Sequence, residues 1–375
     1  MKPGAQMHAD DRADTFLLDA VAYRYGEAVR ASRIAESASD VDVRETGRLE
    51  ENAAYHEMES LLHTVAVDCS ASGFPLTLPP QLLERWSRVH AREMARTALI
   101  HYGALKALGA LDRAGIRAIP LKGFYLASAT FERKGARTFK DLDLLVERSS
   151  LAALNDVLLA AGFTPAPGRP AFVPAPACTV YSLPVEGSET AMEIDIHVGM
   201  HWPEEYERRT AFRAEDLWAE AAPVELEGMP SWAMSPEHLV ITTLLDAAVN
   251  HRYARLIKFR DVLEITRRHE VDWEALEGWC RRWKVCSFVG PGLRYLAEMN
   301  EGFSIPAGTL ASVLPSYAAM KAFHRALPVQ ALPGHRSRSY TPANLLFFML
   351  SDTPLARARG LAYMPLHMYK GRRRF

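Results

Sequence analysis

The stretch LKGFYLASATFERKGARTFKDLDLLV, from Leu121 to Val146, places two aspartates at the head of a hydrophobic strand, beyond a lysine-glycine turn and a solitary arginine. An apolar strand end normally avoids paired negative charge, because buried carboxylates without a partner are costly and like charges repel. The pattern therefore indicates that positive charge lies against Asp141 and Asp143.

The two aspartates are spaced to share one face of a strand. Alternation puts Asp141 and Asp143 on one side and Leu142 on the other, with the two aspartate Cα atoms roughly 6.6 Å apart. Their carboxylates can therefore converge on a common cation. Such a pair is weak evidence when taken alone, since aspartates also cap turns and begin strands.

A second alternating segment, MEIDIH at 192–197, strengthens the interpretation. Glu193, Asp195 and His197 face one way, while the apolar residues between them suit a core. Asp195 can supply a third carboxylate from a neighbouring strand. Three clustered carboxylates repel unless cations neutralise them, and such oxygen ligands suit Mg²⁺ or Mn²⁺.

This acidic cluster predicts a catalytic metal site formed by Asp141, Asp143 and Asp195. Two metal ions about 3.5–4 Å apart can stabilise the attacking and leaving oxygens of a phosphoryl-type displacement. Asp195 is the candidate to accept the proton of the attacking hydroxyl. We expect His197 to orient a metal-bound carboxylate without binding the metal itself. The alternative is that His197 is only a hydrogen-bonded histidine at the end of the sheet. Zinc binding by His197 with His201 is disfavoured, because these residues lie on and just beyond a strand.

The turn after Pro120 predicts a cradle for phosphate oxygens. Gly123 permits close backbone approach, and a helix begins there. Lys122 and Arg137 would neutralise the remaining phosphate charge, although a lysine at a turn is also commonly solvated.

Further basic residues follow in the segment 235–269, which we expect to be one helix. His251, Arg255 and Lys258 share a face of that helix at i, i+4, i+7 spacing and are candidate nucleotide-binding residues. Asp261 could anchor them by pairing with an arginine or lysine. The alternative is a solvated basic stripe.

The order of the predicted elements indicates an α+β protein in three parts. Helical periodicity fills 15–115, a β-α-β-α run follows to about residue 163, and two strands at 178–185 and 191–200 complete a small mixed sheet. Helices return from 235 to about 363. We therefore predict an N-terminal helical region at 1–95, a mixed-sheet core at 96–225 and a C-terminal helical domain at 226–375.

The composition is that of a soluble globular protein, with 375 residues, 49% hydrophobic and 24% charged, and a formal net charge of -1. Four scattered cysteines argue for a reducing compartment and against structural zinc. The acidic N-terminus is unlike a signal peptide, and no segment reaches the length of a membrane span. We expect a cytoplasmic protein. The basic end YKGRRRF is interpreted as a solvated tail.

The motifs in this order, LKG at 121–123, Arg137, DLDLLV at 141–146 and EIDIH at 193–197, resemble the uncharacterised nucleotidyltransferases of the DNA polymerase beta-like superfamily. The similarity runs from about Trp86 to Asp261. It implies a minimal mixed-sheet nucleotidyltransferase core and metal-dependent transfer of NMP from an NTP. One departure is Gly123-Phe124, where many members of the superfamily have glycine-serine or glycine-glycine.

The predicted activity is therefore nucleotidyl transfer with an NTP as substrate and Mg²⁺ or Mn²⁺ as cofactor. The near-neutral charge favours a small-molecule or peptide or protein acceptor over a long nucleic acid. Two alternatives stay open: a non-catalytic nucleotide-binding or interaction protein with the same fold, and a toxin-like nucleotidyltransferase that modifies RNA.

Overall fold

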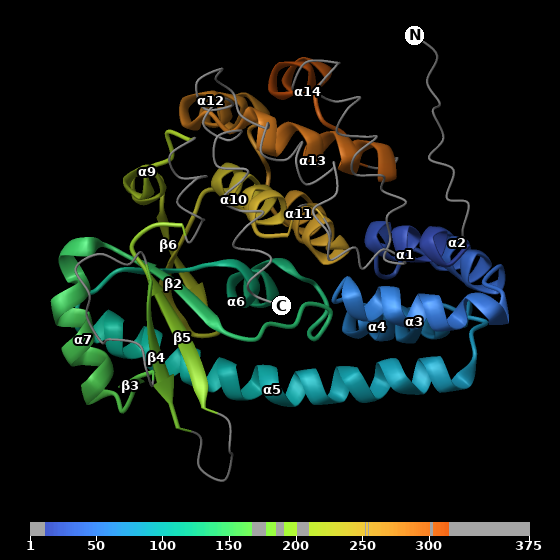
Figure 1. Cartoon of the computed structure of the whole chain (residues 1–375), viewed down its shortest axis with the longest axis horizontal. Helices are drawn as coiled ribbons and strands as arrows, with labels where there is room; N and C mark the ends of the chain where they lie inside the picture. Colours follow the sequence, from blue (N-terminus) through green and yellow to red (C-terminus); the bar gives the residue numbers. More distant parts are fainter. Residues whose placement is uncertain are drawn as a thin grey trace, which may run out of the picture.

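A mixed five-stranded sheet lies among three groups of helices in the computed structural model (Figure 1). The structure describes residues 12–166, 178–184, 191–200, 210–251, 253, 255–300 and 303–314. The N-terminal helices lie to one side of the sheet and the C-terminal helices above it in the view of Figure 1, while the long helix α5 runs beneath both the sheet and the N-terminal helices. This arrangement confirms the predicted α+β class.

The N-terminal region is helical, as the periodicity predicts. Its helices are α1 (Arg12–Ala22), α2 (Ala28–Ser39), a short 3₁₀ turn η1 (Val43–Glu45), α3 (Thr46–Tyr55), α4 (Glu59–Ala71) and α5 (Pro80–Arg113). Helix α5 opens on a proline at its first position, where the missing N–H costs nothing, and the chain turns after it at Gly115, whose φ is +69°. Because α5 is uninterrupted, it lies on both sides of residue 95, where the sequence suggested a domain boundary.

The five strands are β1 (Ala118–Pro120), β2 (Leu142–Val146), β3 (Thr164–Pro165), β4 (Cys178–Leu183) and β5 (Met192–His197), in the order β1-β2-β5-β4-β3. Strands β2 and β5 are parallel, and the other pairs are antiparallel. Leu142, Leu144, Ile194 and Ile196 form the buried face of the two central strands. Helix α5 covers the sheet closely at Gly103, where a Cβ would meet the Met192 sulfur at 2.1 Å. The predicted alternation along both strands is confirmed.

Two short helices link the strands. After β1 the chain forms α6 (Lys122–Tyr125) and continues into a π-helical turn η2 (Leu126–Thr130), and after β2 it forms a 3₁₀ turn η3 (Arg148–Ser150) and α7 (Leu151–Ala160). A second sheet, which the sequence analysis did not foresee, follows the small helix α9 (Ala214–Ala219) as the hairpin β6 (Ala222–Leu226) and β7 (Met229–Ala233). The hairpin packs on α5 and β1 through β7.

The C-terminal helices are α10 (Pro236–Val249), α11 (Leu256–Arg268), α12 (Trp273–Trp283), α13 (Cys286–Met299) and α14 (Ala307–Val313). The prediction of a single helix over 235–269 is therefore wrong. The chain breaks at Tyr253, which has a φ of +57° and donates its backbone N–H to the Ala247 carbonyl at 2.7 Å. Its hydroxyl donates to the Phe288 carbonyl on α13, so a tertiary contact ends the helix that local periodicity would continue.

Some expectations lie outside the described residues. These are the expectations for His201 and the basic tail, and the helices expected beyond residue 314. No helix in the part of the chain that the structure describes has the length and apolar character needed to cross a membrane.

Candidate active site

The lysine-glycine turn brings the backbone very close to a neighbouring loop. Lys122 has a φ of +50°, a left-handed conformation that is unusual for a residue with a side chain and tends to occur at functional sites. At Gly123 a Cβ would lie 2.6 Å from the Cβ of Phe139, so only glycine fits. The turn thereby directs the Lys122 ammonium to within 3.4 Å of Asp143 Oδ2.

This close approach makes Gly123→Ala a test of the turn. We expect the added methyl group to cost about 1–3 kcal/mol of unfolding free energy, because it forces a backbone shift in a packed site. The control is Gly47→Ala in α3, where a Cβ meets nothing within 4 Å and alanine should stabilise the helix by about 1 kcal/mol. Urea unfolding of both variants measures the difference; a Gly123→Ala protein as stable as the wild type would contradict the expectation.

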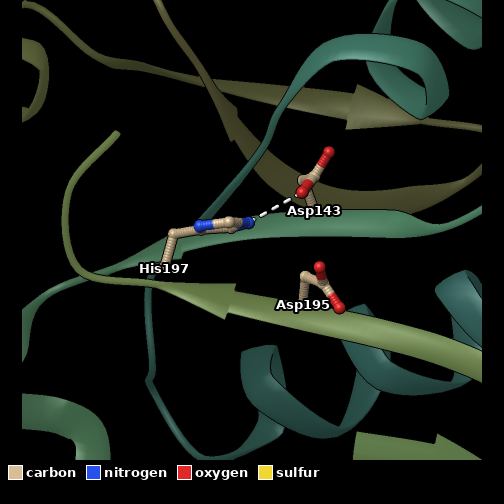
Figure 2. Close-up of side chains that lie close together, drawn as sticks. All are labelled: Asp143, Asp195 and His197. Atoms are coloured by element: carbon tan, nitrogen blue, oxygen red, sulfur yellow. Dashed lines mark hydrogen bonds and ion pairs between the residues drawn. The ribbon is translucent and has the colours of Figure 1, made fainter. Parts of the chain in front are cut away.

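The central strands place two carboxylates side by side. In the parallel pairing of β2 with β5, Asp143 lies directly opposite Asp195. His197 reaches Asp143 from two residues further along β5, with Nε2 2.7 Å from Oδ1 (Figure 2). One ligand atom from each of Asp143, Asp195 and His197 lies within 4.8 Å of the others. The predicted convergence of acids from two strands is thus present, with an imidazole added to it.

Asp141 lies at the edge of this group rather than within it. It precedes β2, is exposed, and lines the same cavity as Asp143. Partial burial, and then the neighbouring Asp143 carboxylate, raise the pKa of Asp141 above its usual value. Burial alone would also raise the pKa of Asp143, but the hydrogen bond with His197 and the ammonium of Lys122 outweigh it and hold that pKa below the usual value. Asp143 is therefore ionised at neutral pH.

The opposite wall of the cavity comes from the C-terminal helices. Lys258 at the start of α11 lies with its Nζ 2.7 Å from Asp246 Oδ2, and His251 Nε2 lies 3.6 Å from the same oxygen. Burial lowers the pKa of His251, so its imidazole is neutral near pH 7. His251 and Lys258 do meet at one site, although they lie on separate elements and not on one helix face as the sequence suggested.

Arg255 has a different environment from its two predicted neighbours. Its guanidinium carbon lies 4.3 Å from the centre of the Tyr55 ring, as a cation–π contact. It is the residue before α11 and is not among the residues that line the cavity.

Arg137 and Asp261 form a buried pair that ties the sheet region to α11. Arg137 Nε and Nη2 donate to the two carboxylate oxygens of Asp261 at 2.7 and 3.1 Å, and Nη1 donates to the Thr138 carbonyl at 2.5 Å. Burial alone would lower the pKa of Arg137, but Asp261 raises it. Asp261 thus pairs with an arginine, but this is Arg137 rather than a member of the basic group 251–258 that we expected it to anchor.

These residues surround a cavity of about 340 Å³, within the range of small-molecule sites. Its lining includes all of Lys122, Gly123, Arg137, Asp141, Asp143, Asp246, His251 and Lys258. The α3–α4 turn contributes Glu57 to the lining, α4 contributes Ser60 and α5 contributes Arg92. One wall is acidic and the facing wall basic, which suits a ligand with both a cation and phosphate groups.

Asp246 is the member of this site that the sequence analysis missed. It is buried in α10, and although burial alone would raise its pKa, the ammonium groups of Lys258 and Lys122 lower it. The signal was a single carboxylate in the otherwise apolar run LVITTLLDAAV, since a buried charge needs a partner.

Asp246→Asn is expected to lower the unfolding free energy at pH 7 by about 1.5–3 kcal/mol, the range for a lost hydrogen bond to a charged group. The folded-state pKa of Asp246 lies below its unfolded value of about 3.9, so the contribution is present above about pH 4 and is lost as the pH falls through the folded pKa. Urea unfolding between pH 7 and pH 3 should show the gap to wild type narrowing below pH 4. The exposed Asp112→Asn is the control, and a gap that stays constant with pH would contradict this account.

One protein family matches most of the chain. The family model of an uncharacterised nucleotidyltransferase matches residues 47–301, which is more than half of the chain. The chain belongs to this family. The matched range runs from α3 to beyond α13 and contains every cavity residue named above. It extends the resemblance seen from Trp86 to Asp261 in both directions, and it confirms that resemblance at the level of the family.

Among solved structures, an antigenic nucleotidyltransferase-like protein from Paracoccidioides brasiliensis is similar to this chain. The two are 14% identical, the match covers 60% of this chain and 94% of that chain, and the TM-score is 0.34. No curated protein matches the chain.

Proposed function

We propose that this protein transfers NMP from an NTP to a hydroxyl or phosphate oxygen of an acceptor, which is a small molecule or a peptide or protein. The new bond joins the acceptor oxygen to the α-phosphorus, and the bond from that phosphorus to the β-phosphate oxygen breaks, so pyrophosphate leaves. The observation that carries this proposal is the parallel register of β2 and β5, which sets Asp195 directly beside Asp143, a carboxylate that lines the same cavity as Lys258 and His251.

The donor set fits a divalent cation. Two carboxylates and an imidazole with ligand atoms within 4.8 Å of one another are oxygen-rich ligands of the kind that Mg²⁺ and Mn²⁺ accept, the nitrogen favouring Mn²⁺ more than Mg²⁺. We assign Asp143 and Asp195 as ligands, with Asp141 joining from the cavity edge and His197 holding the Asp143 carboxylate in place. When bound, such an ion supplies Lewis-acid stabilisation of the charge on the transferred phosphoryl group.

The polyphosphate of the NTP would lie against the basic side of the cavity. The backbone at Gly123 approaches it, and the ammonium groups of Lys122 and Lys258 neutralise it, with His251 as a neutral hydrogen-bonding partner. Arg137 contributes positive charge from its fixed position against Asp261. Arg255 would act on the nucleotide from the rim, beside Tyr55.

Asp195 is assigned as the proton acceptor. It is half-buried and lies on the strand next to Asp143, so a hydroxyl attacking the phosphorus would meet its carboxylate beside the metal ligands. A positioned base of this kind contributes about 10²–10⁴-fold to the rate.

A non-catalytic nucleotide-binding protein is the second candidate, and one feature favours it. The residue after Gly123 is Phe124, which is buried and offers no hydroxyl to a phosphate. In such a protein NTP would bind without any product forming.

Labelling with NTP separates these two functions. Incubation with each α-³²P-labelled NTP and Mg²⁺ or Mn²⁺ should yield labelled acceptor or slow self-labelling together with pyrophosphate, and a chelator should abolish both. Calorimetry on the same samples measures binding. Metal-dependent NTP binding without label transfer to any acceptor in a metabolite and peptide panel would favour the second candidate, and the absence of NTP binding would refute both.

A further inference from the structure

A second cavity, of about 510 Å³, lies on the far side of α11 from the candidate active site. It is bounded by the α1–α2 turn, η2 and α11, and none of its lining residues lines the cavity beside Asp143. At 3.6 residues per turn, Arg260, Glu264 and Arg267 share one face of the helix, and Lys258, which lines the first cavity, lies on the opposite face. The same helix therefore forms a wall of both cavities.

The buried part of this second cavity carries more arginine than carboxylate. Glu264 is shared by Arg260 and Arg267, with Oε1 lying 2.7 Å from Arg260 Nη2 and 2.8 Å from Arg267 Nη1. Burial, and then the neighbouring Arg260, lower the pKa of Arg267 to about 10. Two guanidinium groups thus meet one carboxylate in a partly desolvated space.

Part of this positive charge has a structural role. Arg260 Nη1 donates to the Val21 carbonyl at 2.9 Å and also to that of Tyr23, while Arg267 donates to the carbonyls of Ala22 and Tyr23 at 2.9 and 3.0 Å. These bonds cap the end of α1, where the last carbonyls of a helix have no partner within it. They leave other donors of the cavity unused.

Three buried polar atoms of the lining have no hydrogen-bond partner among the residues that the structure describes. They are Arg260 Nε, Arg24 Nε and Thr130 Oγ1. Arg260 is fully buried and Thr130 is 3% exposed, so water does not readily satisfy the atoms of these two residues, whereas the Arg24 side chain is 40% exposed. Buried polar groups are nearly always hydrogen-bonded in proteins, and an unpaired set around one cavity points to a ligand.

The remaining charges lie toward the rim. Arg268 and Glu132 are exposed, and Glu27 lies 3.4 Å from Arg24 and 3.8 Å from Arg30. The π-helical turn that carries Thr130 is closed by the Phe131 N–H donating to the Leu126 carbonyl at 2.9 Å, and such turns occur frequently at functional sites.

We propose that this cavity binds the phosphate group of a small molecule, with Arg24, Arg260 and Thr130 as hydrogen-bond donors and Arg268 at the entrance. A phosphate oxyanion accepts from several N–H and O–H donors at once and offsets the surplus of guanidinium charge. The volume exceeds that of a phosphate alone and is in the range for a molecule of metabolite size.

The test uses the full chain with a chelator present, so that neither a divalent ion nor catalytic turnover contributes. Inorganic phosphate, AMP and the uncharged adenosine are titrated by calorimetry into three proteins besides the wild type. The test variant combines Arg24→Gln with Thr130→Val, which removes two hydrogen-bond donors of the second cavity. Arg44→Gln is a control that removes an exposed arginine elsewhere. Lys122→Ala is a second control that alters the candidate active site.

Saturable binding of phosphate or AMP, but not of adenosine, is expected for the wild type, Arg44→Gln and Lys122→Ala proteins. The affinity should fall at least about ten-fold in the Arg24→Gln/Thr130→Val protein, with circular dichroism unchanged. Tighter binding of AMP than of phosphate would indicate a phosphorylated metabolite, and equal binding would indicate free phosphate. Absence of saturable binding, or binding lost in Lys122→Ala and kept in the double variant, would overturn the proposal.

Discussion

Asp195→Asn is expected to slow nucleotidyl transfer by at least about 100-fold while leaving NTP affinity within a few-fold of wild type. A roughly 100-fold loss of rate is the low end of the range expected when a general base is removed. Asparagine keeps the size of the side chain but has no carboxylate to take the proton of the attacking hydroxyl. NTP affinity should persist because Asp141, Asp143 and the basic wall are unchanged.

Single-turnover transfer with saturating NTP and metal measures the chemical step, and calorimetry measures NTP affinity. The matched control is Glu193→Gln, which makes the same change of charge on the same face of β5 at an exposed position. Asp195→Glu should recover little, because one more methylene displaces the carboxylate by more than the ~0.5 Å tolerance of a preorganised site. If the Asp195→Asn protein kept the wild-type single-turnover rate, Asp195 would not be the proton acceptor but an ordinary carboxylate at the end of a strand.

Breaking the Arg137–Asp261 pair is expected to have the largest effect on stability. The two side chains are 8% and 1% exposed and are joined by two charge-assisted hydrogen bonds. Asp261→Asn or Arg137→Met leaves one buried charge without its counter-ion, which costs about 3–5 kcal/mol of unfolding free energy. Since Arg137 precedes β2 and Asp261 lies on α11, either change also loosens the contact between the sheet region and the C-terminal helices.

Urea unfolding of the single variants and of the double variant Arg137→Met/Asp261→Leu tests this expectation. The double variant should be more stable than either single one, because an apolar pair of similar volume avoids the uncompensated charge. The control is Arg294→Gln, which breaks an exposed ion pair with Glu298 and should cost less than about 1 kcal/mol. Single variants within about 1 kcal/mol of wild type would contradict the assigned role.

The acidic cluster was predictable from local sequence because strand periodicity is a short-range property. The alternation in DLDLLV and MEIDIH determines which side chains share a face of each strand. The apolar side chains that alternate with the acidic ones must pack against a hydrophobic core. The structure confirms both faces and the pairing of β2 with β5. The placement of Asp141 was less predictable, since β2 begins one residue later, at Leu142.

The basic wall depended on contacts between residues far apart in the chain. Periodicity over 235–269 favours one helix, yet α10 ends at Val249 and the chain turns at Tyr253, whose hydroxyl donates to the Phe288 carbonyl. His251 and Lys258 therefore converge on Asp246 from separate elements. The spacing of His251 and Lys258 placed them together on one helix face, but nothing in it indicates that they meet Asp246.

The sequence by itself thus determined the α+β class, the two acidic strands, the lysine-glycine turn and, through its motifs, the nucleotidyltransferase family. Each of these is a pattern within a few consecutive residues, where backbone geometry determines which side chains are neighbours. Only the tertiary structure decided that Asp246 joins the site, that Arg137 is held by Asp261 rather than left to the solvent, and that Arg24 and Arg260 share a cavity behind α11. Those contacts join residues brought together by packing, and a buried charge can be paired only by whichever opposite charge the fold places beside it.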